Sequence, residues 1–362
     1  MEHLIKPEWF EPMPTIALLA IGAIALWAVI KGADWLVEGA SGMALRAGMS
    51  KVIIGATIVS LGTTSPEAAV SVMAAWSGNP GLALGNAVGS IIADTGLIFG
   101  LGCLLMALPV DRFIVSRQGW VQFGAAVFMG AVCYIIWIFQ GDNATLDRWF
   151  GFVLLVMLAW YLWVSVRWGK QHATLMEQRH EQAQDTTTAI IAHAQEDSWP
   201  KLIGFFVLGL AMVIIFAHIL IICVQLMAQR WGVPQVVIAS TIVALGTSLP
   251  ELVVGITAIR KGHAELLIGN VIGADILNVL FVVGASAAAA PLPIIEAEIG
   301  GQPTAVPEIF LYLHLPTMLL ILGLFRVFIH GAIKHGRFRR WYGVPLVGIY
   351  VGYLVANVVL SR

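Results

Sequence analysis

The sequence contains few charged residues for its length. Asp, Glu, Lys and Arg make up 11% of its 362 residues, whereas a soluble domain usually carries about 25%. This deficit excludes an ordinary water-solvated surface, so most of the chain is predicted to face lipid. The formal net charge of −1 provides no field that would attract nucleic acid, and no nucleic-acid partner is expected.

Cysteine and N-terminal basic residues are also scarce. Three cysteines, Cys103, Cys133 and Cys223, lie far apart in apolar stretches. An odd and scattered set argues against a disulfide framework or a thiolate metal site, so we interpret them as packing residues. The N-terminus, MEHLIKPEWFEPMP, has no basic run before its apolar stretch. It is a poor signal peptide, and that stretch is expected to remain as a membrane span.

Long hydrophobic runs are abundant. Hydrophobic residues make up 59% of the chain, and a membrane helix needs about 20 mostly apolar residues. Ten runs are long enough, so we expect an all-α polytopic membrane protein with about ten transmembrane helices. The predicted spans are 15–31, 52–76, 82–108, 118–140, 149–168, 202–228, 234–259, 264–291, 306–328 and 342–360.

One long polar interruption divides these spans into five and five. We predict a first five-helix unit at 1–168, a polar cytoplasmic loop at 169–200 and a second five-helix unit at 201–362. Partial helical structure within the loop is left open. With the N-terminus outside, sixteen of the twenty Lys and Arg residues lie on the inner side, where cytoplasmic loops carry their excess. Both termini are therefore predicted to lie outside a cell inner or plasma membrane. No obligate protein partner is evident.

An internal repeat relates the two halves. GATIVSLGTTSPE at 55–67 and ASTIVALGTSLPE at 239–251 share eight of thirteen residues at an offset of 184. The same offset aligns GNAVGSIIAD at 85–94 with GNVIGADILN at 269–278. An offset of five spans is odd, so the two copies must cross the membrane in opposite directions. Inverted repeats of this kind are typical of secondary transporters.

Each repeat places one glutamate, Glu67 or Glu251, in the middle of a predicted span. A carboxylate at that depth costs several kcal/mol unless it is paired, hydrated or coordinated, and is a functional hypothesis by default. The structural alternative is a protonated glutamate bonded to a neighbouring helix. We favour ion binding because the same acid recurs within the same motif.

Oxygen-bearing side chains accompany both glutamates at helical spacing. They are Ser60, Thr63, Thr64 and Ser71 in the first motif, and Thr247 and Ser248 in the second. Pro66 and Pro250 lie within spans, and each removes a backbone donor and crowds the carbonyl four residues earlier. The freed carbonyls would need a bound cation or another partner. A simple proline kink is the alternative.

The aligned GN segments carry a second set of polar and small residues. Their amides, hydroxyls and acids are Asn86, Ser90 and Asp94 in one copy, and Asn270, Asp275 and Asn278 in the other. Gly85, Gly89, Gly269 and Gly273 permit close helix approach, and packing is the favoured role for these glycines and for Asn86 and Asn270. An all-oxygen set suits calcium or sodium rather than zinc or copper. No histidine is assigned as a ligand.

The pairing of G-T-(S/T)-x-P-E with G-N-x-x-G resembles the sodium/calcium exchanger family of the cation/calcium exchanger superfamily, in particular its short prokaryotic members. GADWLVEGA at 32–40 also resembles the first span of that family. The resemblance implies ten helices, a central divalent site and flanking monovalent sites served by alternating access. It places calcium on Glu67 and Glu251 with the backbone carbonyls of Thr63 and Thr247.

The remaining ion positions are likewise implied by the resemblance. The flanking sodium sites fall on Ser60, Thr64 and Ser90 on one side, and on Ala244 and Ser248 on the other. The middle position falls on Asp94 and Asn278. Family members usually have serine where this chain has Ala274, and often carry the acid of the Asp94/Asn278 pair in the second repeat. The chain lacks the G-N-x-x-E of proton-coupled exchangers, which favours sodium over protons.

These observations predict an antiporter that exchanges Ca²⁺ for Na⁺ by alternating access, with no cofactor and no enzymatic activity. Because both ions would use the same ligands, they would exclude each other. A Ca²⁺/H⁺ antiporter, with H⁺ as the coupled ion, is the main alternative. A passive cation channel would share the ligands but need no counter-ion. An intramembrane protease is disfavoured because the chain has no G-x-G-D motif and no G-x-S-G with a partner histidine.

Overall fold

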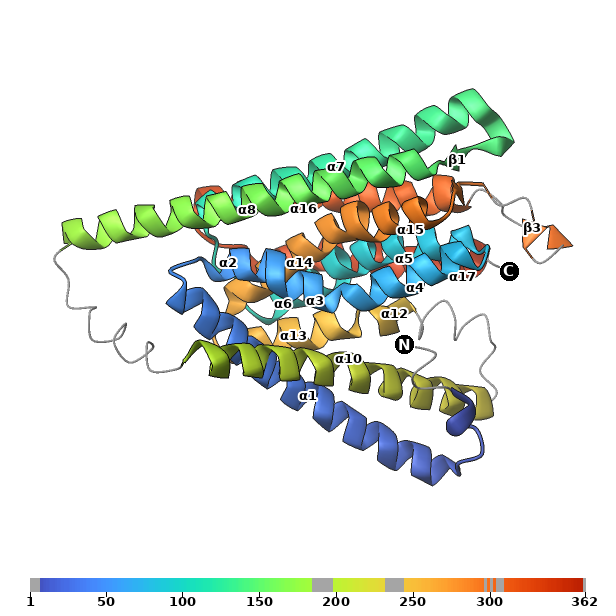
Figure 1. Ribbon diagram of the computed structural model, residues 1–362, viewed down its shortest axis with the longest axis horizontal. Helices are drawn as coiled ribbons and strands as arrows, with labels where there is room; N and C mark the ends of the chain where they lie inside the picture. The colour runs from blue at the N-terminus through green and yellow to red at the C-terminus, as the bar shows by residue number, and fades with distance from the viewer. Residues whose placement is uncertain are drawn as a thin grey trace.

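The computed structural model describes residues 7–183, 198–231, 244–295, 298–299, 302–303 and 309–360. They form a bundle of long helices (Figure 1). In this part of the chain, eight helices are long and apolar enough to cross a membrane. The spans predicted at 52–76 and 234–259 contain shorter helices, and residues 234–243 lie outside the described ranges. The arrangement agrees with the predicted polytopic fold of about ten helices.

The bounds of the elements are as follows. The first half contains η1 (Pro7–Trp9), α1 (Thr15–Arg46), α2 (Lys51–Ile54), the π-helical η2 (Gly55–Val59), α3 (Ser60–Thr63), α4 (Ser65–Trp76), α5 (Pro80–Ala93), the π-helical η3 (Asp94–Phe99), α6 (Gly100–Leu105), α7 (Arg112–Gln140), η4 (Gly141–Asn143), β1 (Thr145–Leu146) and α8 (Arg148–Ala183). The second half contains α10 (Trp199–Arg230), α12 (Ala244–Thr247), α13 (Leu249–Arg260), α14 (Ala264–Leu277), the π-helical η6 (Asn278–Val283), α15 (Gly284–Ala289), β2 (Leu292–Pro293), β3 (Glu298–Ile299), β4 (Gln302–Pro303), the π-helical η7 (Phe310–His314), α16 (Leu315–His335), η8 (Arg340–Tyr342) and α17 (Gly343–Leu360).

The repeat found in the sequence is reproduced in the helix boundaries. The bounds of α1, α3, α4, α5, η3 and α6 recur 184 residues later in α10, α12, α13, α14, η6 and α15. Equivalent helices run in opposite directions: in Figure 1, α1 runs from right to left and α10 from left to right. The two halves are therefore inverted repeats.

Several helices are longer than the predicted spans. α1 continues to Arg46 rather than ending at 31, and α16 ends at His335 rather than at 328. α8 continues to Ala183, into the predicted polar loop at 169–200. Span prediction counts only the apolar stretch of about 20 residues, whereas backbone hydrogen bonding continues a helix into its polar ends.

Glycines bring α1 and α10 into backbone contact. A Cβ added at Gly39 would lie 2.6 Å from the amide nitrogen of Phe206, and one added at Gly209 would lie 2.4 Å from that of Leu36. A Cβ added at Gly32 would similarly lie 2.9 Å from the carbonyl oxygen of Gly209. Small residues permit such an approach between membrane helices, so α1 and α10 form one tightly packed, antiparallel pair.

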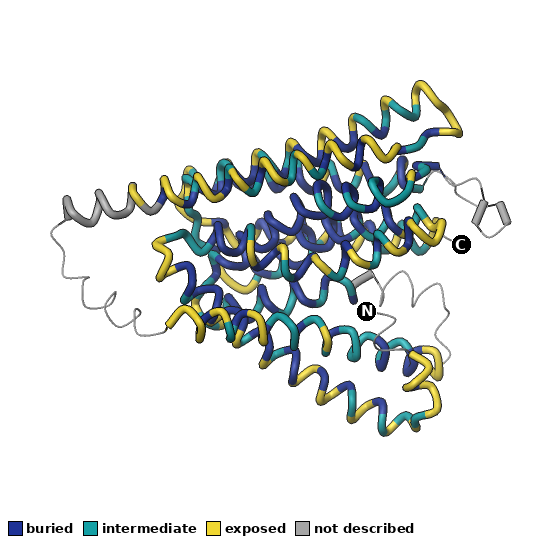
Figure 2. The backbone as a smooth tube through the Cα atoms, viewed as in Figure 1, coloured by how far each residue is buried: buried dark blue, intermediate teal, exposed yellow. Residues whose placement is uncertain are grey.

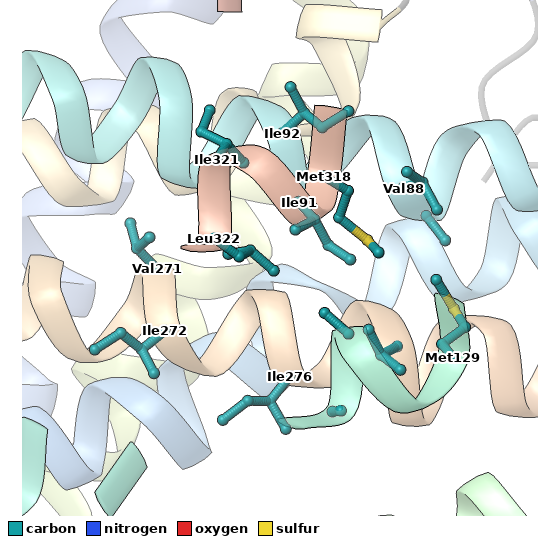
Figure 3. Close-up of a cluster of buried hydrophobic side chains, with 14 of the residues drawn as sticks. Val88, Ile91, Ile92, Met129, Val271, Ile272, Ile276, Met318, Ile321 and Leu322 are labelled. Carbon is teal, nitrogen blue, oxygen red and sulfur yellow. The ribbon is translucent and has the colours of Figure 1, made fainter. Parts of the chain in front are cut away.

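The centre of the bundle is buried and its periphery is exposed (Figure 2). Most residues of 264–289 are buried. The outer helices instead expose large apolar side chains such as Ile138, Phe139 and Trp160, as lipid-facing surfaces do. An apolar cluster fills the space between α5, α7, α14 and α16 (Figure 3). Its labelled members are Val88, Ile91, Ile92, Met129, Val271, Ile272, Ile276, Met318, Ile321 and Leu322.

Short backbone contacts join connections from the two halves at both ends of the bundle. β1 pairs antiparallel with β2, with Thr145 opposite Pro293. Pro109 forms an isolated bridge with Arg337. All three cysteines are free and buried, in agreement with their interpretation as packing residues.

Candidate ion-binding centre

The proline-glutamate pair that recurs in the two repeats lies at a helix break in each of them. α3 ends at Thr63 and α4 begins at Ser65, with Pro66 in its first turn. In the second repeat, α12 ends before Ser248 and α13 begins with Pro250 in its first turn. Proline suits the first turn of a helix because it needs no backbone donor there. Each proline therefore starts a new helix, which places a glutamate in the first turn of α4 or α13.

The polar face of the first motif points into the protein. Leu61, on the opposite face, is 37% exposed, and Ile58 is 42% exposed. This is the reverse of a soluble helix and is expected where the exterior is lipid. The buried polar residues, each 1% exposed or less, are Ser60, Thr63, Thr64, Glu67 and Ser71.

The predicted residues of the second motif and of the partner helices are mostly buried as well. Glu251, Asp94 and Asn278 are each 1% exposed. Ser90 and Ser248 are buried, and Thr247 is half-buried. Ala244 begins α12, but its side chain lies outside the described residues.

The structure brings the acids of the two repeats together. The Glu67 carboxylate interacts electrostatically with those of Glu251 and Asp94, and Asp94 also interacts with Glu251. The hydroxyls of Thr63 and Thr64 lie beside the Glu251 carboxylate. Like charges buried at short range are unfavourable unless a cation or a proton intervenes.

Many oxygens in this region have no hydrogen-bond partner. They are Thr64 Oγ1, Glu67 Oε2, Ser90 Oγ, Asp94 Oδ1, Ser248 Oγ, Glu251 Oε2 and Asn278 Oδ1. Buried polar atoms are normally paired, so this concentration of oxygens is available to bind a cation or water. Hard cations such as Ca²⁺ bind several oxygens of this kind. No group of three His, Cys, Asp or Glu side chains placed to hold a metal occurs in the described ranges, so hydroxyl, amide or carbonyl oxygens would have to complete the coordination.

The asparagines of the GN segments hold neighbouring helices in place. Asn86 Nδ2 donates to the Ser71 hydroxyl over 3.0 Å and to the Glu67 carbonyl over 3.4 Å. Thr63 Oγ1 donates to Asn270 Oδ1 over 3.4 Å. Through these bonds Asn86 supports the segment around Glu67, and Asn270 contacts Thr63 from the other repeat.

Two glycines at equivalent positions have different surroundings. A Cβ added at Gly273 would lie 2.5 Å from Ser60 Oγ and from the carbonyl oxygen of Ala56. One added at Gly89 would find only Tyr353 Oη, at 3.8 Å, within the described residues. The Gly273 contact brings α14 against η2 and α3, which positions one wall of the centre.

One acid has partners that the sequence did not indicate. Asp275 Oδ2 accepts hydrogen bonds of 2.5 Å from Thr95 Oγ1 and from Gln122 Nε2. The sequence marked Asp275 as a further acid only. An amide inside an apolar span, as at Gln122, is the signal that could have found this contact. The π-helical turns that begin at Asp94 and Asn278 were also not predicted, and such turns are frequent at functional sites.

A cavity of about 420 Å³ lies beside the broken helices. Its wall includes Pro66, Pro250 and Thr247, and it extends to Pro7 and Ser77. The rest of its lining comes mainly from apolar residues of α4 and α10. The cavity therefore leads from one end of the bundle to the two helix breaks.

Comparison with known proteins gives consistent results. The family described as sodium/calcium exchanger protein matches residues 17–167 and 201–359. The sodium/calcium exchanger MaX1 of Methanosarcina acetivorans is 29% identical, over 93% of this chain and 97% of its own length. The inner membrane protein YrbG of Escherichia coli is 31% identical, over 76% of this chain and 80% of its own length. A solved structure of the sodium-calcium exchanger NCX_Mj superposes with a TM-score of 0.74 at 23% identity, covering 94% of this chain and 99% of that one. This last likeness shows a shared fold.

Proposed function

Because the chain belongs to the sodium/calcium exchanger family and is therefore a membrane antiporter for calcium and another cation, we propose that the ion it exchanges for Ca²⁺ is Na⁺. The observation that carries this proposal is the meeting of Glu67, Glu251 and Asp94 among unpaired hydroxyl and amide oxygens. Such an oxygen-only set suits either ion. The name of the relative MaX1 gives the same ion pair.

The shared ligands determine the proposed mechanism. One Ca²⁺ bound between Glu67 and Glu251 occupies the carboxylates that Na⁺ ions would also need. The centre therefore holds one set of ions at a time, and each set would cancel part of the buried negative charge. An empty centre retains mutually repelling carboxylates, which disfavours movement of the unloaded protein. This is what an antiporter requires, since only loaded forms should alternate between the two faces.

We further propose that the protein is a carrier without enzymatic activity or a bound cofactor, and that both termini lie outside the cell. The orientation is supported by the excess of Lys and Arg on one set of connections. Arg46, Lys51, Lys261 and Arg337 belong to that set. The proposed location is a cell inner or plasma membrane.

The test uses the purified full-length protein in sealed vesicles. Vesicles loaded with Na⁺ are diluted into Na⁺-free buffer containing ⁴⁵Ca²⁺, and uptake is compared with that in vesicles carrying only a proton gradient and in protein-free vesicles. We expect uptake with the Na⁺ gradient alone. Uptake driven only by protons would replace this proposal with Ca²⁺/H⁺ exchange, and uptake that needs no counter-ion would indicate a channel.

A further inference from the structure

α7 and α16 pack against each other as an antiparallel pair, and their line of contact is the α7/α16 seam. A Cβ added at Gly130 of α7 would lie 3.3 Å from Leu319 Cδ1 of α16, and one added at Gly119 would lie 2.6 Å from Ile329 Cδ1. The contacts therefore follow in opposite order along the two helices. Neither helix contains an Asp or a Glu, so no acid of α7 or α16 neutralises a basic residue in the seam.

One charged side chain, Arg326, lies within this seam. It is two residues before the end of the apolar stretch predicted at 306–328, and a charge at that depth is a functional hypothesis by default. Arg326 is three residues before Ile329, yet its Nη1 lies 3.5 Å from a Cβ added at Gly119. Its Cζ lies 4.1 Å from the ring centre of Trp120. Three helical residues span about 4.5 Å, so the side chain extends along the seam toward the end where α7 begins, as an arginine does when it reaches for a membrane surface.

Protein acceptors do not satisfy the Arg326 guanidinium. Its Nη1 is buried and makes no hydrogen bond, and no carboxylate of the described residues pairs with it. The face of Trp120 attracts the cation but leaves the five donors of a guanidinium without an oxygen. Trp120 is 59% exposed and Arg326 is half-buried. An acceptor supplied by the surrounding membrane can therefore approach Arg326 from outside the protein.

Further basic residues continue toward the same end of the seam. His330 and Lys334 follow Arg326 at intervals of four residues, on the same face of α16, and both are exposed. Arg112, the first residue of α7, reaches the end of α16, where its Nη2 lies 3.9 Å from a Cβ added at Gly336. This end of the seam, the basic end, therefore carries several cations on an outward-facing surface.

The other end of the α7/α16 seam is closed by uncharged groups. Tyr134 Oη donates to the Leu311 carbonyl over 2.8 Å, and Trp137 packs edge-on against Tyr312. α7 contains no Lys or Arg from residue 118 to residue 140. A negatively charged ligand of the seam would therefore be attracted to the basic end alone.

We propose that the basic end of the α7/α16 seam binds the headgroup of an anionic phospholipid. Arg326 and Arg112 hold the phosphate, because the guanidinium fork matches phosphate oxygens, and Trp120 supports the Arg326 guanidinium from the side of the bilayer. Val127 and Phe128 continue the face of Trp120 toward the bilayer centre and are exposed, so the acyl chains have an apolar surface to lie on. Basic pockets between membrane helices bind anionic headgroups in this way. The proposal does not depend on which ion is exchanged for Ca²⁺.

Native mass spectrometry of the purified full-length protein provides the test. Protein in a neutral detergent is titrated with phosphatidylglycerol or with phosphatidylcholine, which carries a phosphate but no net charge. We expect the wild type to bind phosphatidylglycerol more tightly than phosphatidylcholine. The variant Arg326→Gln should lower the affinity for phosphatidylglycerol about fivefold, which is the typical effect of one basic residue near an anionic headgroup.

Arg167→Gln is the matched control. Arg167 also stacks on a tryptophan, with its Cζ 3.7 Å from the ring centre of Trp163, but it lies on α8, so this variant should bind phosphatidylglycerol like the wild type. Equal affinity of the wild type for the two lipids would overturn the proposal even if Arg326→Gln does not fold. An equal loss in Arg167→Gln would also overturn it, because binding would then follow total charge. Displacement of the lipid by inorganic phosphate would do the same, because the site would then take a free anion.

Discussion

Asp275 and Ile91 occupy the same position in the two repeats and have opposite surroundings. Ile91 packs in the apolar cluster with Ile92 and Met318 (Figure 3), whereas Asp275 bonds to Thr95 and Gln122. The helix that carries each residue has equivalent bounds in both halves. The two repeats therefore share the same helix boundaries, whereas individual side chains determine which repeat carries an acid at a given position.

Other matched positions on these helices also share their backbone structure but differ in their polar side chains. Asp94 is matched by Asn278, and Ser90 by Ala274, so acid and hydroxyl are not duplicated. The glutamates are the exception, because each repeat retains one in the first turn of the helix after the break. Substituting the two glutamates should therefore have the same effect in both repeats. Substitutions at other matched positions should have different effects in the two repeats.

The largest effect is expected for Glu67→Gln and Glu251→Gln. Removing one member of a buried charged set costs about 3–5 kcal/mol, so each variant should lose sodium-driven ⁴⁵Ca²⁺ uptake by more than about 100-fold. Purified variants should still elute as folded protein on gel filtration. Normal uptake by either variant would show that the two glutamates are not equivalent and would end the ion-site assignment.

The next effect concerns the glycines at equivalent positions. Gly273→Ala places a methyl group 2.5 Å from Ser60 Oγ and the Ala56 carbonyl oxygen, and overpacking of this kind costs about 1–3 kcal/mol. The melting temperature in detergent should fall clearly for Gly273→Ala and little for Gly89→Ala. Equal losses would show that the close contact of Gly273 with Ser60 and Ala56 does not determine the effect.

A smaller effect is expected when the acid of the Asp94/Asn278 pair is moved. Asp94→Asn should lower calcium uptake about tenfold, which corresponds to about 1.4 kcal/mol. The double variant Asp94→Asn/Asn278→Asp restores the charge on the opposite repeat and should recover most of the loss. Failure of the double variant to recover uptake would mean that the position of the acid matters as well as the total charge.

The smallest effect concerns the turns before α5 and α14. Asn79 caps α5 by accepting from the Leu82 amide over 3.1 Å, whereas the equivalent His263 contacts Lys51 Nζ at 2.8 Å. Burial and the Lys51 charge lower the pKa of His263, so the neutral ring stabilises the fold. This contribution is present above the unfolded pKa of about 6.5 and is lost as the pH falls through the lower folded value.

The melting temperature should therefore decrease slightly more between neutral and mildly acidic pH for the wild type than for His263→Asn. Thermal unfolding in detergent, followed by tryptophan fluorescence at both pH values, measures the difference. An identical pH dependence in both proteins would show that His263 does not contribute.

Much of the fold could be predicted because lipid imposes simple requirements. Apolar runs of about 20 residues indicate membrane spans. An acid within such a run indicates a functional site, because burying a charge in the membrane costs free energy. Glu67 and Glu251 were found in this way, and their meeting followed from the repeat. The extent of α8, which continues to Ala183, could not be predicted, because a polar helix has no apolar signal.

The sequence marks Gln122 as an amide within an apolar span that needs a polar partner, but it does not identify Asp275 as that partner. Gln122 and Asp275 are 153 positions apart in the sequence. The internal repeat does not relate them, because Gln122 lies outside the aligned segments. Their contact depends on how α7 packs against α14. Periodicity describes one helix at a time, so it cannot assign such a pair.

The glycine contacts between α1 and α10 have a consequence for ancestry. Each half contributes one of these helices, and the two run antiparallel with their backbones touching at Gly32, Gly39 and Gly209. A half-length ancestor inserted into the membrane in both orientations would have formed an antiparallel homodimer through this helix interface. The interface would then have existed before the gene was duplicated and fused, and the later covalent joining would have preserved a former homodimer.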